Sequence, residues 1–332
     1  MSDLEEPTPE GVRLNGGQPY RLGFLEVDSV LYRDGALSSS KTRRIGHREN
    51  VFEFGGPLYH YTSIAGLQGI ISTNGFWASD NRFMNDAEEL DHGLKLAAFV
   101  AESCGQRTQN REFGAILERL GAKLSAQNSV GNLVACFSRT RDSLEQWRGY
   151  GPSGAVCIKV DHRSLEGERP LFAGPDLLPR SVLYKKRPKL AMLLSVIRRF
   201  EEQYDLDRKS MTPRWPNNHD DHYERTLLFR LSYFAAGFKN PAFIQENEVR
   251  LVISHSNADR FNGLKFRASP FGLVPYINTG DYVASGRLPI REILIGPSPH
   301  QGLMAASVRT FIDSYGYTAT KIELSEVPFR AS

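Results

Sequence analysis

A strand pattern that continues directly into a helix pattern, at residues 58–73, constrains the fold of this chain more than any other segment. Gly55-Gly56-Pro57 interrupts the chain, and the aromatic run that follows is typical of a β-strand. Ser63 stands where a helix N-cap is expected, because apolar residues recur at helical spacing after it. Asn74-Gly75 is a typical helix end. The segment therefore predicts a strand, a helix over 63–73 and a sharp turn.

The end of this strand carries polar side chains. Because side chains alternate along a strand, His60 and Thr62 are predicted to point one way, and Tyr61 and Ser63 the other. A helix N-terminus attracts anions, so a polar strand end next to a helix suits a phosphorylated ligand. The alternative is that His60 only ends a strand and Ser63 only caps a helix, with no ligand involved.

The other predicted elements mix strands and helices without regular alternation. Strands are expected at 76–79, 132–138, 154–160, 248–254, 264–267 and 291–295, and helices from Asn85 onward and at 109–126, 189–204, 222–236 and 300–315. This order is typical of an α+β fold with a mixed sheet. Residues 1–50 are predicted to be an N-terminal extension, and residues 51–332 a single domain with a helical insertion around 162–240.

The charge and cysteine content narrow the class of protein. The formal charge is +3 with a pI near 8.7, which allows a nucleotide or nucleic-acid partner without requiring one. Three scattered cysteines argue against a disulfide framework and against a structural zinc site. No apolar run reaches the length of a membrane span, and the N-terminus is acidic and polar. We therefore expect a soluble, cytoplasmic protein with no membrane partner.

Residues 245–253 form the second informative segment. Interpreted as a strand, the segment places Glu246, Glu248 and Arg250 on one face and mostly apolar residues on the other. Two interpretations of the charged face stay open. It is either a salt-bridged stripe on an exposed sheet, or a pocket wall whose carboxylate hydrogen-bonds a sugar hydroxyl and stabilises positive charge on an anomeric carbon.

A third segment, residues 136–151, joins a strand end to aromatic residues. Ser138 ends the strand, and Trp147 and Tyr150 follow on a predicted helix and at the turn after it. Their rings suit contact with a base or another flat ring. The alternative is a core tryptophan beside a glycine turn.

The sequence argues against several other classes of enzyme. The run His219-Asp220-Asp221-His222 offers metal ligands, but its place at a predicted helix start favours capping and interaction with the helix dipole. Phosphate-binding Walker loops, dinucleotide glycine motifs and the Gly-x-Ser-x-Gly elbow do not occur at a strand–helix junction.

Taken together, these segments resemble a large bacterial family catalogued as a domain of unknown function. The resemblance covers about residues 57–325 and rests on several short motifs in order. They are Leu58–Ser63, Trp77, Asn85–Glu88, Cys136–Ser138, Trp147, Val156–Ile158, Glu246–Arg250 and Ile293–Pro297.

The strand end at His60 and the later glutamate strand also resemble those of the ADP-ribosyltransferase superfamily. The resemblance implies a split β-sheet core and NAD as a substrate, with no metal required. It implies that His60 binds the adenosine ribose and Thr62 lies near the nicotinamide side. Ser138 would take the central-strand position, Glu248 the catalytic one, and Glu246 would orient the acceptor.

The resulting hypothesis is an NAD-dependent ADP-ribosyltransferase that modifies a protein or nucleic acid, in a toxin or phage-defence role. The remaining residues predicted to bind the cofactor are Tyr61, Ser63, Trp147, Tyr150 and Arg250. This hypothesis requires His60 and Glu248 to face one cleft. Two alternatives stay open: a nucleotide- or nucleic-acid-binding module without catalysis, and a metal-dependent nuclease that uses His60, Glu246 and Glu248.

Overall fold

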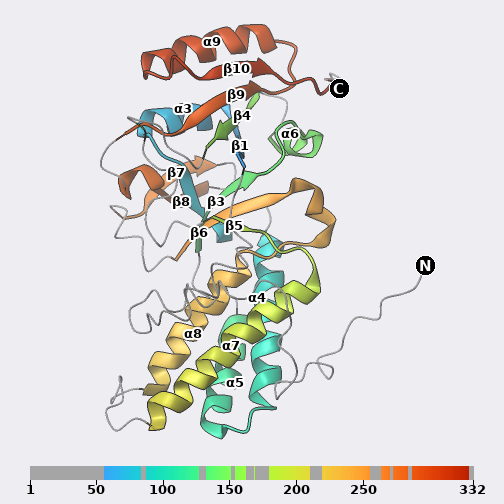
Figure 1. Ribbon diagram of the computed structural model, residues 1–332, viewed down its shortest axis with the longest axis vertical. Helices are drawn as coiled ribbons and strands as arrows, with labels where there is room; N and C mark the ends of the chain where they lie inside the picture. Colours follow the sequence, from blue (N-terminus) through green and yellow to red (C-terminus); the bar gives the residue numbers. More distant parts are fainter. Residues whose placement is uncertain are drawn as a thin grey trace, which may run out of the picture. The chain divides into compact units, whose positions relative to one another are not determined.

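The computed structural model describes residues 56–83, 87–126, 132–150, 154–161, 168, 179–209, 219–254, 263–269, 272–282 and 286–328 (Figure 1). The predicted extension, residues 1–50, and the motif Asn85-Asp86 lie outside these ranges. The chain divides into two compact units, one helical and one built on a sheet. The helical unit takes the segments Leu90–Val130 and Lys185–Ala235, where the sequence patterns had predicted one domain with an insertion around 162–240.

The helical unit contains most of α4 (Ala87–Gly105), with α5 (Arg111–Ser125), α7 (Lys186–Lys209) and α8 (His219–Ala235). Helix α8 lies against both α5 and α7 (Figure 1). The buried Glu224 of α8 forms ion pairs with Arg119 and Lys123 of α5, which tie these two helices together. No helix among the described residues is both long and apolar enough to cross a membrane.

The other unit is built on a mixed sheet, as the sequence predicted. Its strands are β1 (Leu58–Ser63), β2 (Trp77–Asp80), β3 (Asn132–Ser138), β4 (Ala155–Val160), β5 (Pro179–Ser181), β6 (Glu248–Ser254), β7 (Lys265–Ser269), β8 (Gly272–Asn278), β9 (Ile290–Ile295) and β10 (Lys321–Leu324). The strand order is β10-β9-β4-β1-β3-β2-β8-β7, and β6 joins β3 to β5. Strands β9 and β10 pair in parallel, and the other named pairs are antiparallel.

Strand β3 is the branch point of the sheet. It pairs with β6 along its whole length, with β1 at Ser138, and with β2 through Leu133 and Val134. Because β6 occupies one edge of β3, strands β1 and β2 share the other edge. The sheet therefore divides at β3, which brings the two segments that carry the predicted site, β1 and β6, onto the same central strand.

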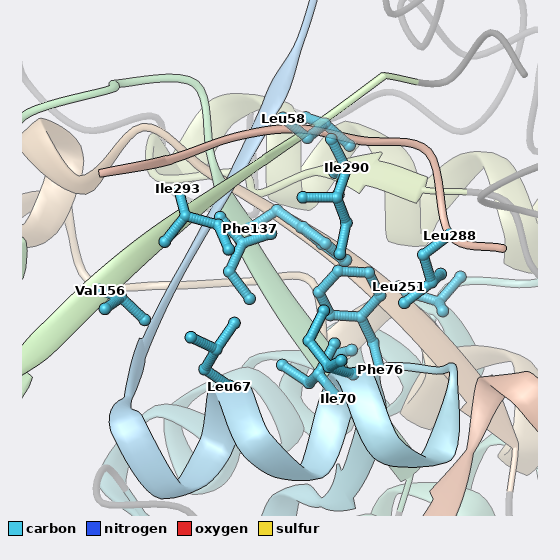
Figure 2. Close-up of a cluster of buried hydrophobic side chains, with 14 of the residues drawn as sticks. Leu58, Leu67, Ile70, Phe76, Phe137, Val156, Leu251, Leu288, Ile290 and Ile293 are labelled. Carbon is cyan, nitrogen blue, oxygen red and sulfur yellow. The ribbon is translucent and has the colours of Figure 1, made fainter. Parts of the chain in front are cut away.

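One face of this sheet is covered by α3 (Ile64–Thr73) and α9 (Gln301–Ser314). Figure 2 shows Leu67 and Ile70 of α3 pointing toward side chains of the sheet. The same buried cluster takes Val308 and Ile312 from α9 and alternate residues of the strands, including Leu58, Phe137, Val156, Val249 and Leu251. Burying these apolar side chains stabilises the unit, at about 1.5–3 kcal/mol for each large one. We refer to this side as the helix-covered face.

The strand-to-helix segment forms as the sequence predicted. Ser63 is the N-cap of α3, and its Oγ accepts a hydrogen bond from the backbone N–H of Gly66 at 3.1 Å. Asn74 ends the helix in the left-handed conformation, with φ of 51°. Helix α6 (Leu144–Tyr150) and the short 3-10 helices η2 (Asn81–Phe83), η3 (Pro241–Glu246) and η5 (Thr279–Tyr282) complete the described elements of this unit.

The capping role of Ser63 is directly testable. Ser63→Ala is expected to lower the free energy of unfolding by about 1 kcal/mol, because it removes the only side-chain oxygen that the structure shows on the N–H of Gly66. The matched control is Ser72→Ala, at an exposed position within α3, which is expected to change the stability by less than about 0.5 kcal/mol. Urea unfolding curves measure both, and equal effects would contradict the capping role.

Candidate functional site

The pairing register decides which predicted site residues share a face of the sheet. Tyr59 lies opposite Ser138, and Ser138 lies opposite Glu248. Directly paired residues point to the same side. Tyr59, Ser138 and Glu248 therefore form a row on the face opposite the helix-covered one. His60 follows Tyr59 and points the other way, so the prediction that His60 and Glu248 face one cleft is wrong.

His60 belongs to the helix-covered face. Its ring lies 5.0 Å from that of Phe76 and 5.5 Å from that of Phe137, centroid to centroid. Its Nδ1 is 2.7 Å from the carbonyl oxygen of Cys136. Burial lowers the pKa of His60 to about 4 and outweighs this hydrogen bond, which acts in the opposite direction. The imidazole is therefore neutral at pH 7, and its Nδ1–H donates a hydrogen bond to the Cys136 carbonyl.

The neighbours of His60 on the strand have local contacts. Thr62 shares the face of His60, as the alternation predicted, because the two stand two residues apart in β1. Its side chain lies so close to Gly66 of α3 that a Cβ there would stand 2.0 Å from the Thr62 hydroxyl. Ser63 caps α3. The structure thus uses both residues to join the strand to its helix.

The aromatic residues predicted to grip a ring lie in a second buried cluster. Tyr61 and Trp147 meet edge to face, with ring centroids 4.8 Å apart. The Tyr61 hydroxyl donates to the Thr140 carbonyl at 2.9 Å, and the indole N–H of Trp147 donates to Asp142 at 2.6 Å. Because both rings are almost fully buried, this arrangement favours the alternative of a core tryptophan. Tyr150 ends α6, and its side chain lies outside the described part of the structure.

Glu248 begins β6 and is held between two cations. Arg250 donates to both its carboxylate oxygens, Nε to Oε1 and Nη2 to Oε2, each at 2.9 Å. The ammonium group of Lys239 lies 3.3 Å from Oε2. Burial would raise the pKa of Glu248, but Arg250 and Lys239 outweigh it and hold the pKa at about 2. Glu248 is therefore ionised at neutral pH and fixed in one orientation.

Glu246 reaches the same lysine from outside the strand. The prediction that Glu246, Glu248 and Arg250 lie along one strand is wrong for Glu246, which ends η3. Asn247 stands between them in the left-handed conformation, with φ of 45°, so simple alternation does not apply. The ammonium group of Lys239 nevertheless lies 2.7 Å from Oε2 of Glu246. The side chain of Glu246 is 24% exposed and that of Glu248 is 5% exposed, so Glu246 is the carboxylate that a ligand can reach.

Ser138, at the end of β3, connects this strand to the end of η3. Its hydroxyl donates to the backbone carbonyl of Glu246 at 2.7 Å and accepts from the N–H of Thr140 at 3.0 Å. Burial of the nearby Cys136 thiol raises its pKa far above the usual range. Ser138 thus positions η3 against β3, where the resemblance had implied the central-strand position of an NAD site.

We call Lys239, Glu246, Glu248 and Arg250 the carboxylate cluster. Sequence patterns missed Lys239, because it lies seven residues before Glu246, in a loop between α8 and η3 without periodic signal. Tyr184 was also missed; its hydroxyl accepts a hydrogen bond from the N–H of Glu248 at 2.8 Å. The cluster presents an accessible carboxylate on a rigid base of buried cations. Such a group accepts hydrogen bonds from neighbouring hydroxyls.

Metal binding and known relatives add no further constraint. Within the ranges that the structure describes, no three His, Cys, Asp or Glu side chains are grouped as metal ligands. Comparison of the chain with protein-family models, with curated proteins and with solved structures gave no match.

Proposed function

We propose that this chain binds a nucleotide of the NAD class at the carboxylate cluster. The observation that carries this proposal is the placement of Glu246. Its Oε2 lies 2.7 Å from the ammonium group of Lys239, and its side chain is still 24% exposed. A carboxylate held in this way is able to accept hydrogen bonds from the two neighbouring hydroxyls of a ribose, as acidic residues do in other nucleotide sites.

The surroundings of Glu246 favour binding because they are fixed beforehand. Lys239 is shared with Glu248, which Arg250 holds with two hydrogen bonds. Arg250 in turn donates to the carbonyl oxygen of Ala236 at 2.8 Å. A ligand that meets groups already held in place loses little of its binding free energy to ordering side chains.

Calorimetry with the full-length chain tests this proposal. NAD, ADP-ribose and AMP are titrated into wild type and into Glu246→Gln, which keeps the shape of the side chain and removes its charge. Glu246→Gln is expected to weaken binding about 10- to 100-fold, the loss of one or two charge-assisted hydrogen bonds. The matched control is Glu118→Gln, an exposed glutamate of α5, which is expected to bind as wild type does.

Two outcomes would overturn the proposal. Either wild type binds none of the three nucleotides, or Glu246→Gln and Glu118→Gln bind them as tightly as wild type. Thermal unfolding of each variant shows whether it is folded before the titration is interpreted.

ADP-ribosyl transfer in a form that gives His60 no role is the second candidate, and the meeting of Glu246 and Glu248 at one ammonium group favours it. In that reaction the bond between C1′ of the ribose and nicotinamide breaks, and its electron pair leaves with nicotinamide. An acceptor nucleophile, on a protein or nucleic acid, forms the new bond to C1′ and loses its proton. Glu246 would stabilise the positive charge that develops on the ribose. Glu248 would act through Lys239, because Arg250 already occupies both its oxygens.

Nicotinamide release separates transfer from binding alone. Wild type that binds NAD and releases nicotinamide with labelling of a cell extract supports transfer, and Glu246→Gln is then expected to lose that release by 100-fold or more. Wild type that binds NAD without release, in buffer and in extract, would leave the binding function and remove the transfer.

A further inference from the structure

An exposed aromatic ring lies beside the carboxylate cluster. Phe243, in η3, is 39% exposed. The ammonium group of Lys239 lies 5.0 Å from the centre of its ring. We propose that the heteroaromatic ring of the bound nucleotide stacks on Phe243. This inference rests on the proposed nucleotide binding and adds to it a base-binding residue.

The relation between Phe243 and the carboxylates matches the shape of a nucleoside. Lys239 is the common neighbour: its ammonium group contacts Glu246, Glu248 and the ring of Phe243. In a nucleoside the base is attached directly to the ribose, so a ribose at Glu246 carries its base to a position within reach of this ring. Lys239 lies over the ring, and the exposed part of the ring offers a surface for stacking.

The backbone around Phe243 is held at both ends. Asn240 caps η3 by accepting a hydrogen bond from the N–H of Ala242 at 3.0 Å. At the other end the N–H of Asn247 donates to the Ile244 carbonyl, and Ser138 donates to the carbonyl of Glu246. The ring is thus presented on an anchored turn, which lowers the entropy that stacking would otherwise cost.

Ile244 supplies a matched comparison within the same turn. It is 45% exposed, next to Phe243, and carries no ring. Both residues are exposed apolar side chains on η3, so truncating either removes similar surface. Only the loss of Phe243 removes a ring that a base could stack on.

The test measures the affinity of the full-length chain for AMP, NAD and the ring-free compound ribose 5-phosphate. Phe243→Ala is expected to weaken binding of AMP and NAD about 10-fold or more, the usual loss for one base–aromatic stack. Phe243→Tyr is expected to keep it, and Ile244→Ala to leave it unchanged. Binding of ribose 5-phosphate is expected to be the same in all four proteins.

The outcomes separate this inference from the proposed function. If wild type binds no nucleotide, the proposed function fails, and the inference fails with it. If wild type binds AMP and NAD, and Phe243→Ala binds them equally well, only the inference is overturned. Equal losses for AMP and ribose 5-phosphate, or equal losses in Phe243→Ala and Ile244→Ala, would also overturn it, because the effect would then not come from the ring.

Discussion

Replacing Glu248 with alanine is expected to lower the free energy of unfolding of the sheet unit by about 3–5 kcal/mol. The side chain is 5% exposed, and it is the carboxylate that Arg250 and Lys239 both contact. Its removal leaves both cations buried without that partner, and a buried charge that loses a partner is costly. Urea unfolding followed by tryptophan fluorescence, to which the buried Trp147 of the same unit contributes, measures the change.

Two comparisons make this prediction specific. Glu246→Ala removes a carboxylate from the same lysine at a more exposed position, and we expect it to cost less than about 1 kcal/mol. The double variant with Glu248→Ala and Arg250→Met is expected to lose less than the two single variants together, because the residues are coupled. A loss below about 1 kcal/mol for Glu248→Ala would show that the cluster is not an important source of stability.

The ion pair of Glu248 with Arg250 is expected to make the stability of the folded chain depend on pH at low pH. The pKa of Glu248 in the folded chain is about 2, below the value near 4.3 of an unfolded glutamate. The stabilisation is therefore present above about pH 4.3 and is lost as the pH falls through the folded pKa. It amounts to roughly 3 kcal/mol. Glu248→Gln is accordingly expected to unfold with a weaker dependence on pH between pH 5 and pH 2.

His60 is expected to make the sheet unit less stable as the pH falls from 7 to 5. Its pKa is about 4 in the folded chain, against about 6.5 when unfolded, because burial disfavours the charged imidazole. Between these values the unfolded chain takes up a proton that the folded chain does not. Stability is therefore fully present above about pH 6.5 and decreases below it. The contribution to the change from pH 7 to pH 5 is roughly 2 kcal/mol.

The measurement is the free energy of unfolding at pH 7 and pH 5, for wild type and for His60→Gln. The variant carries no titrating group at this position, so its stability is expected to change less between the two pH values. His300→Gln, at an exposed position before α9, is the matched control and is expected to keep the wild-type difference. If His60→Gln and wild type lose the same stability, the buried neutral histidine is not the cause.

His60 and Glu248 show what local sequence patterns could predict and what they could not. Alternation along a strand correctly placed His60 with Thr62, and Glu248 with Arg250, because it depends only on the backbone geometry of one strand. It could not show which face of β1 corresponds to which face of β6. That relation depends on the register of both strands against β3, which is set by contacts between residues far apart in the sequence.

The other helices and strands likewise divide into those that local signals predicted and those that depend on contacts in the folded chain. Helix α3 and strand β6 were predicted, since a cap and an apolar period are local signals. Strand β8 was missed, and it contains Pro275, which normally argues against a strand. Strand β10 has only four residues, mostly exposed, and it exists because β9 offers it a partner. Helix α8 starts at His219, earlier than predicted.

The sequence by itself determined the α+β class, the strand–helix junction at Ser63 and the apolar face of β6, because each follows from short-range spacing of side chains. Only the tertiary structure decided that His60 and Glu248 lie on opposite faces of the sheet. It also decided that Lys239 joins Glu246 to Glu248, and that Asn247 turns Glu246 out of the strand. The physical reason is that a site is assembled by strand register and by contacts of loop residues, neither of which leaves a periodic signal in the chain.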